Sequence, residues 1–300
     1  MSEVTIESLA INERFCLDFY DKSTFLQSVV STHTLDMLRK HMDGHLSFDP
    51  GEVEVDVEAG ALAGLFEIVA GQWRSLGVAK PHFSVLSNPE WLPAQLTPQK
   101  LAEFYATGAE DVALLRQICQ RNGIELPVQG RCVELGCGVG RVTTHLAAQF
   151  RELVAVDISP GNLRECVQAL QACGQGHVQM VQIAAPDDVK ALGPMDLLFS
   201  RMVLQHNPPP VQRFMLEALL FQLRPGGIAC FQTITAGRNY RFSVERHALR
   251  HKTVDFELHA LPMQRVLSLI EAAGCRLVDV FRDLAGGYNV DSYTFLAVRR

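Results

Sequence analysis

Three glycines at alternating positions follow a short apolar run, and they constrain the fold more than any other feature of the chain. The run Val133-Glu134-Leu135 leads directly into Gly136, Gly138 and Gly140. Glycine is needed where the backbone turns sharply or lets a ligand touch the main chain, because a Cβ would clash in both cases. The pattern predicts a buried strand that ends in a tight turn, with a nucleotide-type ligand held against that turn.

A second apolar run, Glu152-Leu153-Val154-Ala155-Val156-Asp157, reads as the next buried strand and ends in a carboxylate. In a doubly wound sheet this arrangement places Asp157 beside the glycine turn. From there the carboxylate can accept hydrogen bonds from both hydroxyls of a ribose. The two runs together are far more specific for such a ligand than either run alone.

The spacing of the glycines bears on which ligand is expected. A dinucleotide site uses Gly-x-Gly-x-x-Gly, and the third glycine position counted from Gly136 is occupied here by Arg141. The order apolar-Glu-x-Gly-x-Gly-x-Gly, with an acid ending the next strand, instead resembles the first motif of class I S-adenosylmethionine-dependent methyltransferases. This resemblance covers roughly residues 128–300. It implies S-adenosyl-L-methionine as cofactor and S-adenosyl-L-homocysteine as product.

From about residue 128 onward, short apolar runs alternate with amphipathic segments, which indicates an α/β fold with a largely parallel sheet. The resemblance implies the Rossmann-like methyltransferase fold, a doubly wound, seven-stranded, mostly parallel sheet whose last strand is antiparallel. We expect the strands at 131–136, 152–157, 178–184, 195–200, 228–234, 276–282 and 293–299. We therefore assign 128–300 to the methyltransferase domain, with an insertion at 236–259.

The segment before residue 128 has a different pattern. Residues 1–95 form a mainly helical extension, expected to act as a cap or a dimerisation region, with a helix near 22–43. Strict alternation of acidic and apolar residues at 52–58 predicts a strand with one wet face. Apolar residues at helical spacing follow at 62–76 and indicate a helix that packs in the core or at an interface. Residues 96–127 are expected to be a helical lid or linker.

The resemblance assigns the cofactor site residue by residue. Gly136, Gly138 and Gly140 match the glycine motif, and Asp157 matches the ribose-binding acid. Glu134 matches the family's acid that faces the ammonium group at the methionine end. An alternative for Glu134 is a carboxylate that accepts hydrogen bonds from the amides of the turn.

The adenine end has a weaker match. Where the family often carries an Asp at the end of the third strand, this chain has Ala184-Ala185. Asp187 is our candidate for the missing acid, and the alternative is that Asp187 and Asp188 cap the short helix that follows. Ser200, at the end of the fourth strand, completes the expected cofactor-binding set.

The segment after the fourth strand is where acceptor chemistry is expected, because the carboxyl ends of parallel strands face the ligand. His206 is the candidate base that removes a proton from an acceptor hydroxyl, since an imidazole titrates near neutrality. Arg201 is assigned with it to the catalytic site, as an anchor for a carboxylate of substrate or cofactor. The alternative for His206 is packing, or capping of the helix that follows the prolines.

Composition limits the partners of the chain. Its 300 residues carry a formal net charge of −6, which disfavours a surface devoted to nucleic acid. No apolar run is long enough to cross a bilayer, and no secretory signal is recognised. The eight cysteines show no zinc-ligand spacing, so we expect them to be reduced and buried and expect no metal site. A cytoplasmic location and a homodimer are compatible with these features.

The sequence therefore predicts a methyltransferase that modifies a small-molecule acceptor, by O-methylation with deprotonation assisted by His206. Two other classes stay open. The insertion 236–259 carries five Arg or Lys against three acidic residues, and this surplus is the support for an RNA or protein methyltransferase. A catalytically silent S-adenosylmethionine-binding partner subunit is the other alternative.

Overall fold

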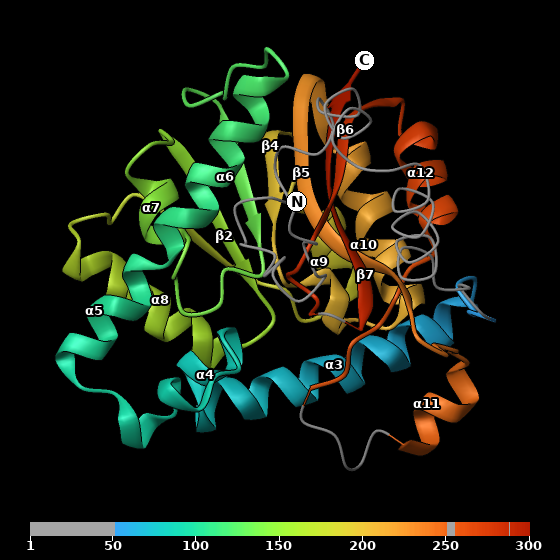
Figure 1. Ribbon diagram of the computed structural model, residues 1–300, viewed down its shortest axis with the longest axis horizontal. Coiled ribbons are helices and arrows are strands. Elements are labelled where there is room, and N and C mark those ends of the chain that lie inside the picture. The colour runs from blue at the N-terminus through green and yellow to red at the C-terminus, as the bar shows by residue number, and fades with distance from the viewer. Residues whose placement is uncertain (1–51, 251–255, 288) are drawn as a thin grey trace, which may run out of the picture. The chain divides into compact units, whose positions relative to one another are not determined.

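The glycine turn follows an interior strand of a seven-stranded sheet. The computed structural model describes residues 52–250, 256–287 and 289–300 (Figure 1). The strands lie in the order β3-β2-β1-β4-β5-β7-β6. Their bounds are β1 Arg131–Leu135, β2 Glu152–Asp157, β3 Gln179–Gln182, β4 Met195–Ser200, β5 Leu223–Gly237, β6 Cys275–Asp283 and β7 Val290–Arg299. The seven strands expected from the apolar runs are confirmed, with β5 longer than predicted.

The sheet is parallel from β3 to β5, and β7 runs antiparallel to both of its neighbours. In the centre, Val133 of β1 lies opposite Val154 of β2 and Leu198 of β4. All three side chains are buried. Such continuous burial is typical of parallel strands, because helices cover both faces of the sheet.

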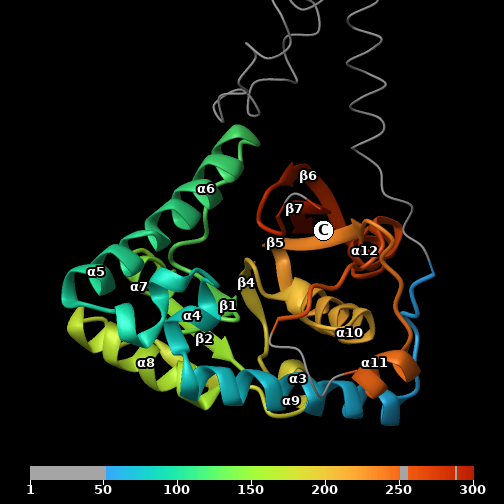
Figure 2. The same cartoon turned by 60° about the horizontal axis from the view of Figure 1, so that its bottom comes forward.

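Helices pack on both faces, which produces two separate apolar cores. One face carries α6, α7 and α8, and the other carries α9, α10 and α12. Figure 2 shows α7 and α8 on one side of the strands and α10 and α12 on the other. The bounds are α6 Gly108–Arg121, α7 Thr143–Ala147, α8 Pro160–Ala172, α9 Pro186–Lys190, α10 Pro209–Phe221 and α12 Met263–Ala272.

The helix ends follow the signals in the sequence. The Ser159 hydroxyl accepts the Asn162 amide at the start of α8, with Pro160 in the first turn. Likewise, Thr97 accepts the Lys100 amide at the start of α5 (Pro98–Ala106). The remaining short elements are α4 Pro81–Val85, η3 Pro89–Trp91, η4 Pro93–Gln95, η5 Leu204–His206 and α11 Val244–Arg250.

The prediction of a strand at 52–58 is wrong. Only Val53 pairs there, in an isolated bridge with Phe242. The alternation itself is real, because Val55 is buried while Glu54 and Asp56 are exposed. A single extended segment thus buries one row of side chains against helices without joining the sheet.

The apolar residues at 62–76 lie on α3 (Ala59–Ala79), a long helix that crosses one end of the sheet (Figure 1). Leu65 and Phe66 belong to the core shared with α10. The helix predicted near 22–43 lies outside the described residues.

The seven cysteines of the described segments are free thiols, and all except Cys173 are buried. Among the helices described, none is both long and apolar enough to span a membrane.

Candidate functional site

A cavity of about 960 Å³, including its open mouth, lies where β1, β2 and β4 end. Apolar side chains and a few polar groups line it together, which is the usual composition of a ligand site. Helices α3, α4, α8 and α10 supply the other walls. The residues that line the cavity include Phe66, Val69, Trp73, Val85, Glu134, Gly136, Gly138, Arg141, Asp157, Ile158, Asn162, Ile183, Arg201, Met202, Val203 and His206.

The glycine turn forms the floor of this cavity. Gly136 has φ +75°, and a Cβ there would lie 2.3 Å from a methyl group of Val203. Both the conformation and the space therefore require glycine. Gly140 does not line the cavity, and a Cβ on it would lie 2.8 Å from Sγ of Cys166 on α8. Its role in the structure is to let α8 approach the turn.

Asp157 lies at the end of β2 beside the turn, as the sequence predicts. Its Oδ2 accepts the Gly138 amide at 2.9 Å, and its Oδ1 accepts the Ser159 amide at 2.8 Å. Burial raises the pKa of this carboxyl to about 6 in spite of these hydrogen bonds. At neutral pH the group is an anion whose position is already set by two backbone amides.

Glu134 is buried at the end of β1, and its Oε2 has no hydrogen-bond partner among the described residues. Burial raises the pKa of its carboxyl to about 7. An unpartnered carboxylate oxygen that faces a cavity is costly unless a ligand supplies a hydrogen-bond donor or a positive charge. The site is therefore built for a group such as an ammonium at this end.

This burial predicts the effect of replacing Glu134 by Gln in the ligand-free protein. Since the folded-state pKa lies above the ordinary value, the wild type loses stability as pH rises from about 4.5 through 7. At pH 8 we expect Glu134→Gln to raise the free energy of unfolding by about 1–3 kcal/mol. At pH 4, where the carboxyl binds its proton in both the folded and the unfolded state, this gain should largely vanish. Urea unfolding at both pH values measures it.

Glu271 on α12 provides the matched control, because Glu271→Gln replaces a carboxylate that is already exposed to solvent. Its effect should stay within about 0.5 kcal/mol at both pH values. An unchanged or lower stability of Glu134→Gln at pH 8 would contradict the argument.

Besides Gly140, two of the expected cofactor residues, Asp187 and Ser200, do not line the cavity. Asp187 is exposed, and its carboxylate pairs with Lys190 at 2.9 Å. Asp188 accepts the amides of Ala184 and Ala185, which caps α9. Ser200 is buried, and its hydroxyl donates to the Leu135 carbonyl at 3.3 Å, so it joins β4 to β1 behind the cavity wall.

His206 lines the cavity at the end of η5. Its Nδ1 lies 3.2 Å from the Glu257 carbonyl oxygen, which can only accept, so Nδ1 carries the proton and Nε2 is the basic nitrogen. The Gln205 side-chain amide lies 3.4 Å from Nε2. Burial lowers the pKa of the imidazole to about 4. The ring is therefore neutral at physiological pH, and it lies edge-on to Trp73 at a centroid distance of 5.3 Å.

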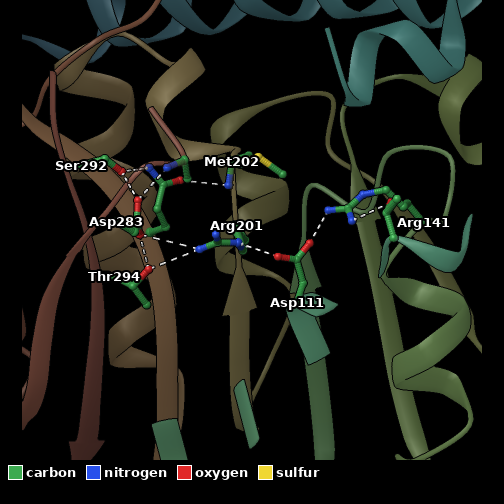
Figure 3. A network of polar contacts seen from close by, with 10 residues as sticks. Asp111, Arg141, Arg201, Met202, Asp283, Ser292 and Thr294 are labelled. Atoms are coloured by element: carbon green, nitrogen blue, oxygen red, sulfur yellow. Dashed lines mark hydrogen bonds and ion pairs between the residues drawn. The ribbon is translucent and has the colours of Figure 1, made fainter. Parts of the chain in front are cut away.

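Arg201 lines the cavity, but its guanidinium is already paired within the protein (Figure 3). Its Nε lies 2.6 Å from Oδ1 of Asp111, and its Nη1 lies 3.7 Å from Oδ2 of Asp283. The other oxygen of Asp111 pairs with Arg141, which also lines the cavity. One buried carboxylate on α6 thus holds two arginines of the cavity wall.

Met202 follows Arg201 with φ +58°, a conformation that is uncommon for a residue with a side chain. Its amide donates to the Gln232 side chain at 2.9 Å, which holds the turn in place. A residue keeps such a conformation only where its surroundings hold it in place, and residues of this kind are frequent at functional sites. The turn aims the segment from Met202 to His206 at the cavity.

Several functional positions are not evident from the sequence. The stripe on α3 contributes Phe66, Val69 and Trp73 to the cavity, although the pattern indicated only a core or an interface. The helical spacing marks the buried face correctly but does not tell a cavity wall from a core. For Asp111 no signal exists, since an acid in the first turn of a helix is typical of a solvated position.

Comparison with known proteins gives a consistent result. Residues 132–227 match the family model described as a methyltransferase domain. A curated relative, trans-aconitate 2-methyltransferase from Methylobacterium nodulans, is 32% identical over 111 residues. That match covers 36% of this chain and 40% of the relative, so it spans less than half of either protein.

Solved structures share the fold at low sequence identity. Magnesium protoporphyrin IX methyltransferase from Synechocystis, with bound S-adenosylmethionine, is 15% identical with a TM-score of 0.54. The alignment covers 83% of this chain and all of that one. The 1,6-didemethyltoxoflavin-N1-methyltransferase of Burkholderia thailandensis is 19% identical with a TM-score of 0.51, covering 83% and 93%. These similarities show the Rossmann-like methyltransferase fold.

Proposed function

We propose that this chain is an S-adenosylmethionine-dependent methyltransferase for a small-molecule acceptor, because residues 132–227 match the family model of a methyltransferase domain. The observation that carries the proposal is a pair of buried acids, Glu134 and Asp157. Both line the cavity whose floor is the glycine turn. One acid has an oxygen without a partner among the described residues, and the other lies beside the turn. These two hydrogen-bond acceptors fit a ligand with an ammonium group at one end and ribose hydroxyls in the middle.

The residues that would hold the cofactor follow from this fit. Gly136 and Gly138 allow close approach to the backbone, Asp157 would accept the ribose hydroxyls, and Glu134 would bind the methionine ammonium. When bound, S-adenosylmethionine supplies an electrophilic methyl group on a sulfonium centre.

Asp187 has no part in the adenine site we propose, because its carboxylate is exposed outside the cavity lining. Ile158 and Ile183 line the cavity next to Asp157. Ile158 follows Asp157 in the chain, and the Ile183 amide donates a hydrogen bond to the Asp157 carbonyl at 3.0 Å. We assign the adenine to these apolar side chains.

The part of the cavity that would bind the acceptor, here called the acceptor half, lies between the glycine turn and the aromatic wall formed by Trp73 and His206. Methyl transfer to an acceptor requires alignment with the methyl group, and a rigid wall supplies this alignment. Because Arg201 is paired with two carboxylates, its role would be to shape the wall rather than to react.

We assign His206 Nε2 as the group that takes the acceptor's proton during O-methylation. A neutral imidazole with a pKa of about 4 is a weak base, so it suits an acidic hydroxyl that still carries its proton at neutral pH, such as that of a phenol or an enol. The partial match to a protein named for trans-aconitate is compatible with an acidic acceptor.

Two measurements test the function. Calorimetric titration with S-adenosylhomocysteine should show one site, and ligand at about 100 times its dissociation constant should stabilise the fold by about 2.7 kcal/mol. A screen for methyl transfer to phenols, carboxylic acids, amines and RNA then identifies the acceptor class. Absence of binding would refute the cofactor assignment. Binding without turnover on any class would favour a silent partner subunit, and salt-dependent turnover on RNA would favour a nucleic-acid enzyme.

Replacement of His206 by Ala tests the base. With an acceptor hydroxyl, we expect kcat to fall about 10²- to 10⁴-fold, the usual contribution of a positioned general base. The loss should shrink as more acidic acceptors are used, because they need less help to ionise. Steady-state kinetics over a series of substituted acceptors measures this trend.

The control is His177→Ala, which removes an exposed imidazole and should leave kcat unchanged. Equal losses for all acceptors, whatever their acidity, would assign His206 to packing against Trp73 instead.

A further inference from the structure

We propose that His247, Glu257 and His259 form a binding site for a divalent transition-metal ion, with Zn²⁺ as the preferred ion. The three residues offer one ligand atom each, and these atoms all lie within 4.8 Å of one another. They come from α11 and from the segment that leads to α12, which are separated in the chain. The proposal does not depend on the methyltransferase function.

The distances suit a single shared ion. His247 Nδ1 and His259 Nε2 each lie 3.1 Å from Oε2 of Glu257. In a tetrahedral zinc site with bonds of about 2.0–2.2 Å, neighbouring ligand atoms are roughly 3.3 Å apart. Both imidazoles therefore converge on one carboxylate oxygen at nearly the separation that coordination requires. Two His and one Glu leave a fourth position for water or another ligand.

The donor chemistry selects the class of ion. Two imidazole nitrogens and one carboxylate suit zinc and its first-row neighbours, whereas Mg²⁺ and Ca²⁺ prefer oxygen ligands only. Both histidines are buried, and Glu257 is 20% exposed, so the site is shielded yet open on one side.

A neighbouring side chain orients one of the ligands. The Tyr240 hydroxyl lies 3.0 Å from Nδ1 of His259. A metal-bound histidine usually hydrogen-bonds its other ring nitrogen to a fixed partner, which sets the tautomer and the ring plane. Here that partner would leave Nε2 free to bind the ion. The backbone is held as well, because the His259 amide donates to the Gln205 carbonyl at 2.7 Å.

The site lies directly behind the cavity described above. The Glu257 carbonyl oxygen faces Nδ1 of His206, and the ring of Phe256 lies edge-on to Trp73 at 5.9 Å. An ion on the Glu257 side chain would hold this short segment against the aromatic wall. Metal binding and the shape of the acceptor half are thereby connected through two consecutive residues.

The sequence predicts no metal site, because the spacing of Cys and His along the chain matches no zinc motif. His259 follows Glu257 closely, but His247 lies ten positions before Glu257, and only the fold brings the three together. Linear spacing carries no signal for such a site.

Metal uptake by the full chain tests the proposal. Protein stripped with a chelator is titrated with Co²⁺, whose visible absorption reports a site of low coordination number, and with Zn²⁺ by calorimetry. We expect one equivalent of either ion. The titration uses a Cys173→Ser background, because Cys173 is an exposed thiol that can also bind Zn²⁺.

Three substitutions and one control locate the ion. His247→Ala and Glu257→Gln should weaken binding about 100-fold or more, and Tyr240→Phe should weaken it about 10- to 100-fold by removing the partner of His259. His177→Ala removes an exposed histidine and should change nothing. Since a buried histidine variant can fail to fold, Glu257→Gln and Tyr240→Phe, which preserve shape, decide the matter.

The proposal is overturned if the wild type takes up no ion, or if these two variants bind as tightly as the wild type. S-adenosylhomocysteine binding, measured on the same preparations, reports separately on the methyltransferase assignment. Loss of the metal with retained nucleoside binding would support the metal site alone.

Discussion

Replacement of Asp157 by Ala should weaken the binding of S-adenosylhomocysteine by roughly 100-fold or more. The carboxylate would accept both ribose hydroxyls, and hydrogen bonds to a charged group are worth about 1.5–3 kcal/mol each. The same change removes the acceptor of the Gly138 amide, so the turn loses one of its restraints. Calorimetric titration of the variant and the wild type at pH 8 measures the loss.

The matched control is Asp187→Ala, which removes an exposed carboxylate outside the cavity. We expect it to bind the ligand like the wild type, although the family resemblance had made Asp187 the candidate for adenine. If Asp157→Ala retains full affinity, or if Asp187→Ala loses it, the proposed placement of the nucleoside is incorrect.

Replacement of Asp111 by Ala should lower the free energy of unfolding by about 3–5 kcal/mol. This carboxylate pairs with Arg201 and Arg141 together, and all three side chains are largely buried (Figure 3). Its removal takes away the carboxylate partner of Arg141 and leaves Arg201 with the longer pair to Asp283. A buried charge that loses its partner is far more costly than the loss of a surface pair. Urea unfolding monitored by circular dichroism measures the change.

Glu110, the adjacent residue, is exposed, and Glu110→Ala provides the control. It should cost less than about 1 kcal/mol, which includes its small favourable effect at the start of α6. A loss below 1 kcal/mol for Asp111→Ala would mean that water or other groups compensate the two arginines. In that case the ion pairs of Asp111 with Arg141 and Arg201 would contribute little to the stability of the fold.

The strands, the glycine turn after β1 and the position of Asp157 beside that turn could be predicted because their determinants are local. A buried parallel strand is a short apolar run, and the turn after β1 demands glycine at Gly136 whatever the rest of the chain does. Asp157 follows from the same logic, because the end of β2 must lie beside the end of β1.

The acceptor half could not be predicted, because it depends on contacts between distant segments. Trp73 and His206 meet only after α3 has packed across the end of the sheet. The two arginines meet on Asp111 because α6 covers one face of the sheet and β4 ends nearby. The alternation at 52–58 misled for a related reason: it reports which side chains are buried, and burial against helices produces the same pattern as a sheet.

Trp73, which lines the cavity, and Phe256, which packs against Trp73, come from outside the stretch that holds most of the site. The glycine turn, both acids and His206 fall within 132–227, the stretch that matches the family model, whereas Trp73 and Phe256 lie outside it on either side. Under the proposed function, mutations in α3 or near Phe256 would alter which compound is accepted while leaving the proposed nucleoside contacts intact. Substrate choice could then change through substitutions in these two segments alone, without any change to the residues that would hold the methyl donor.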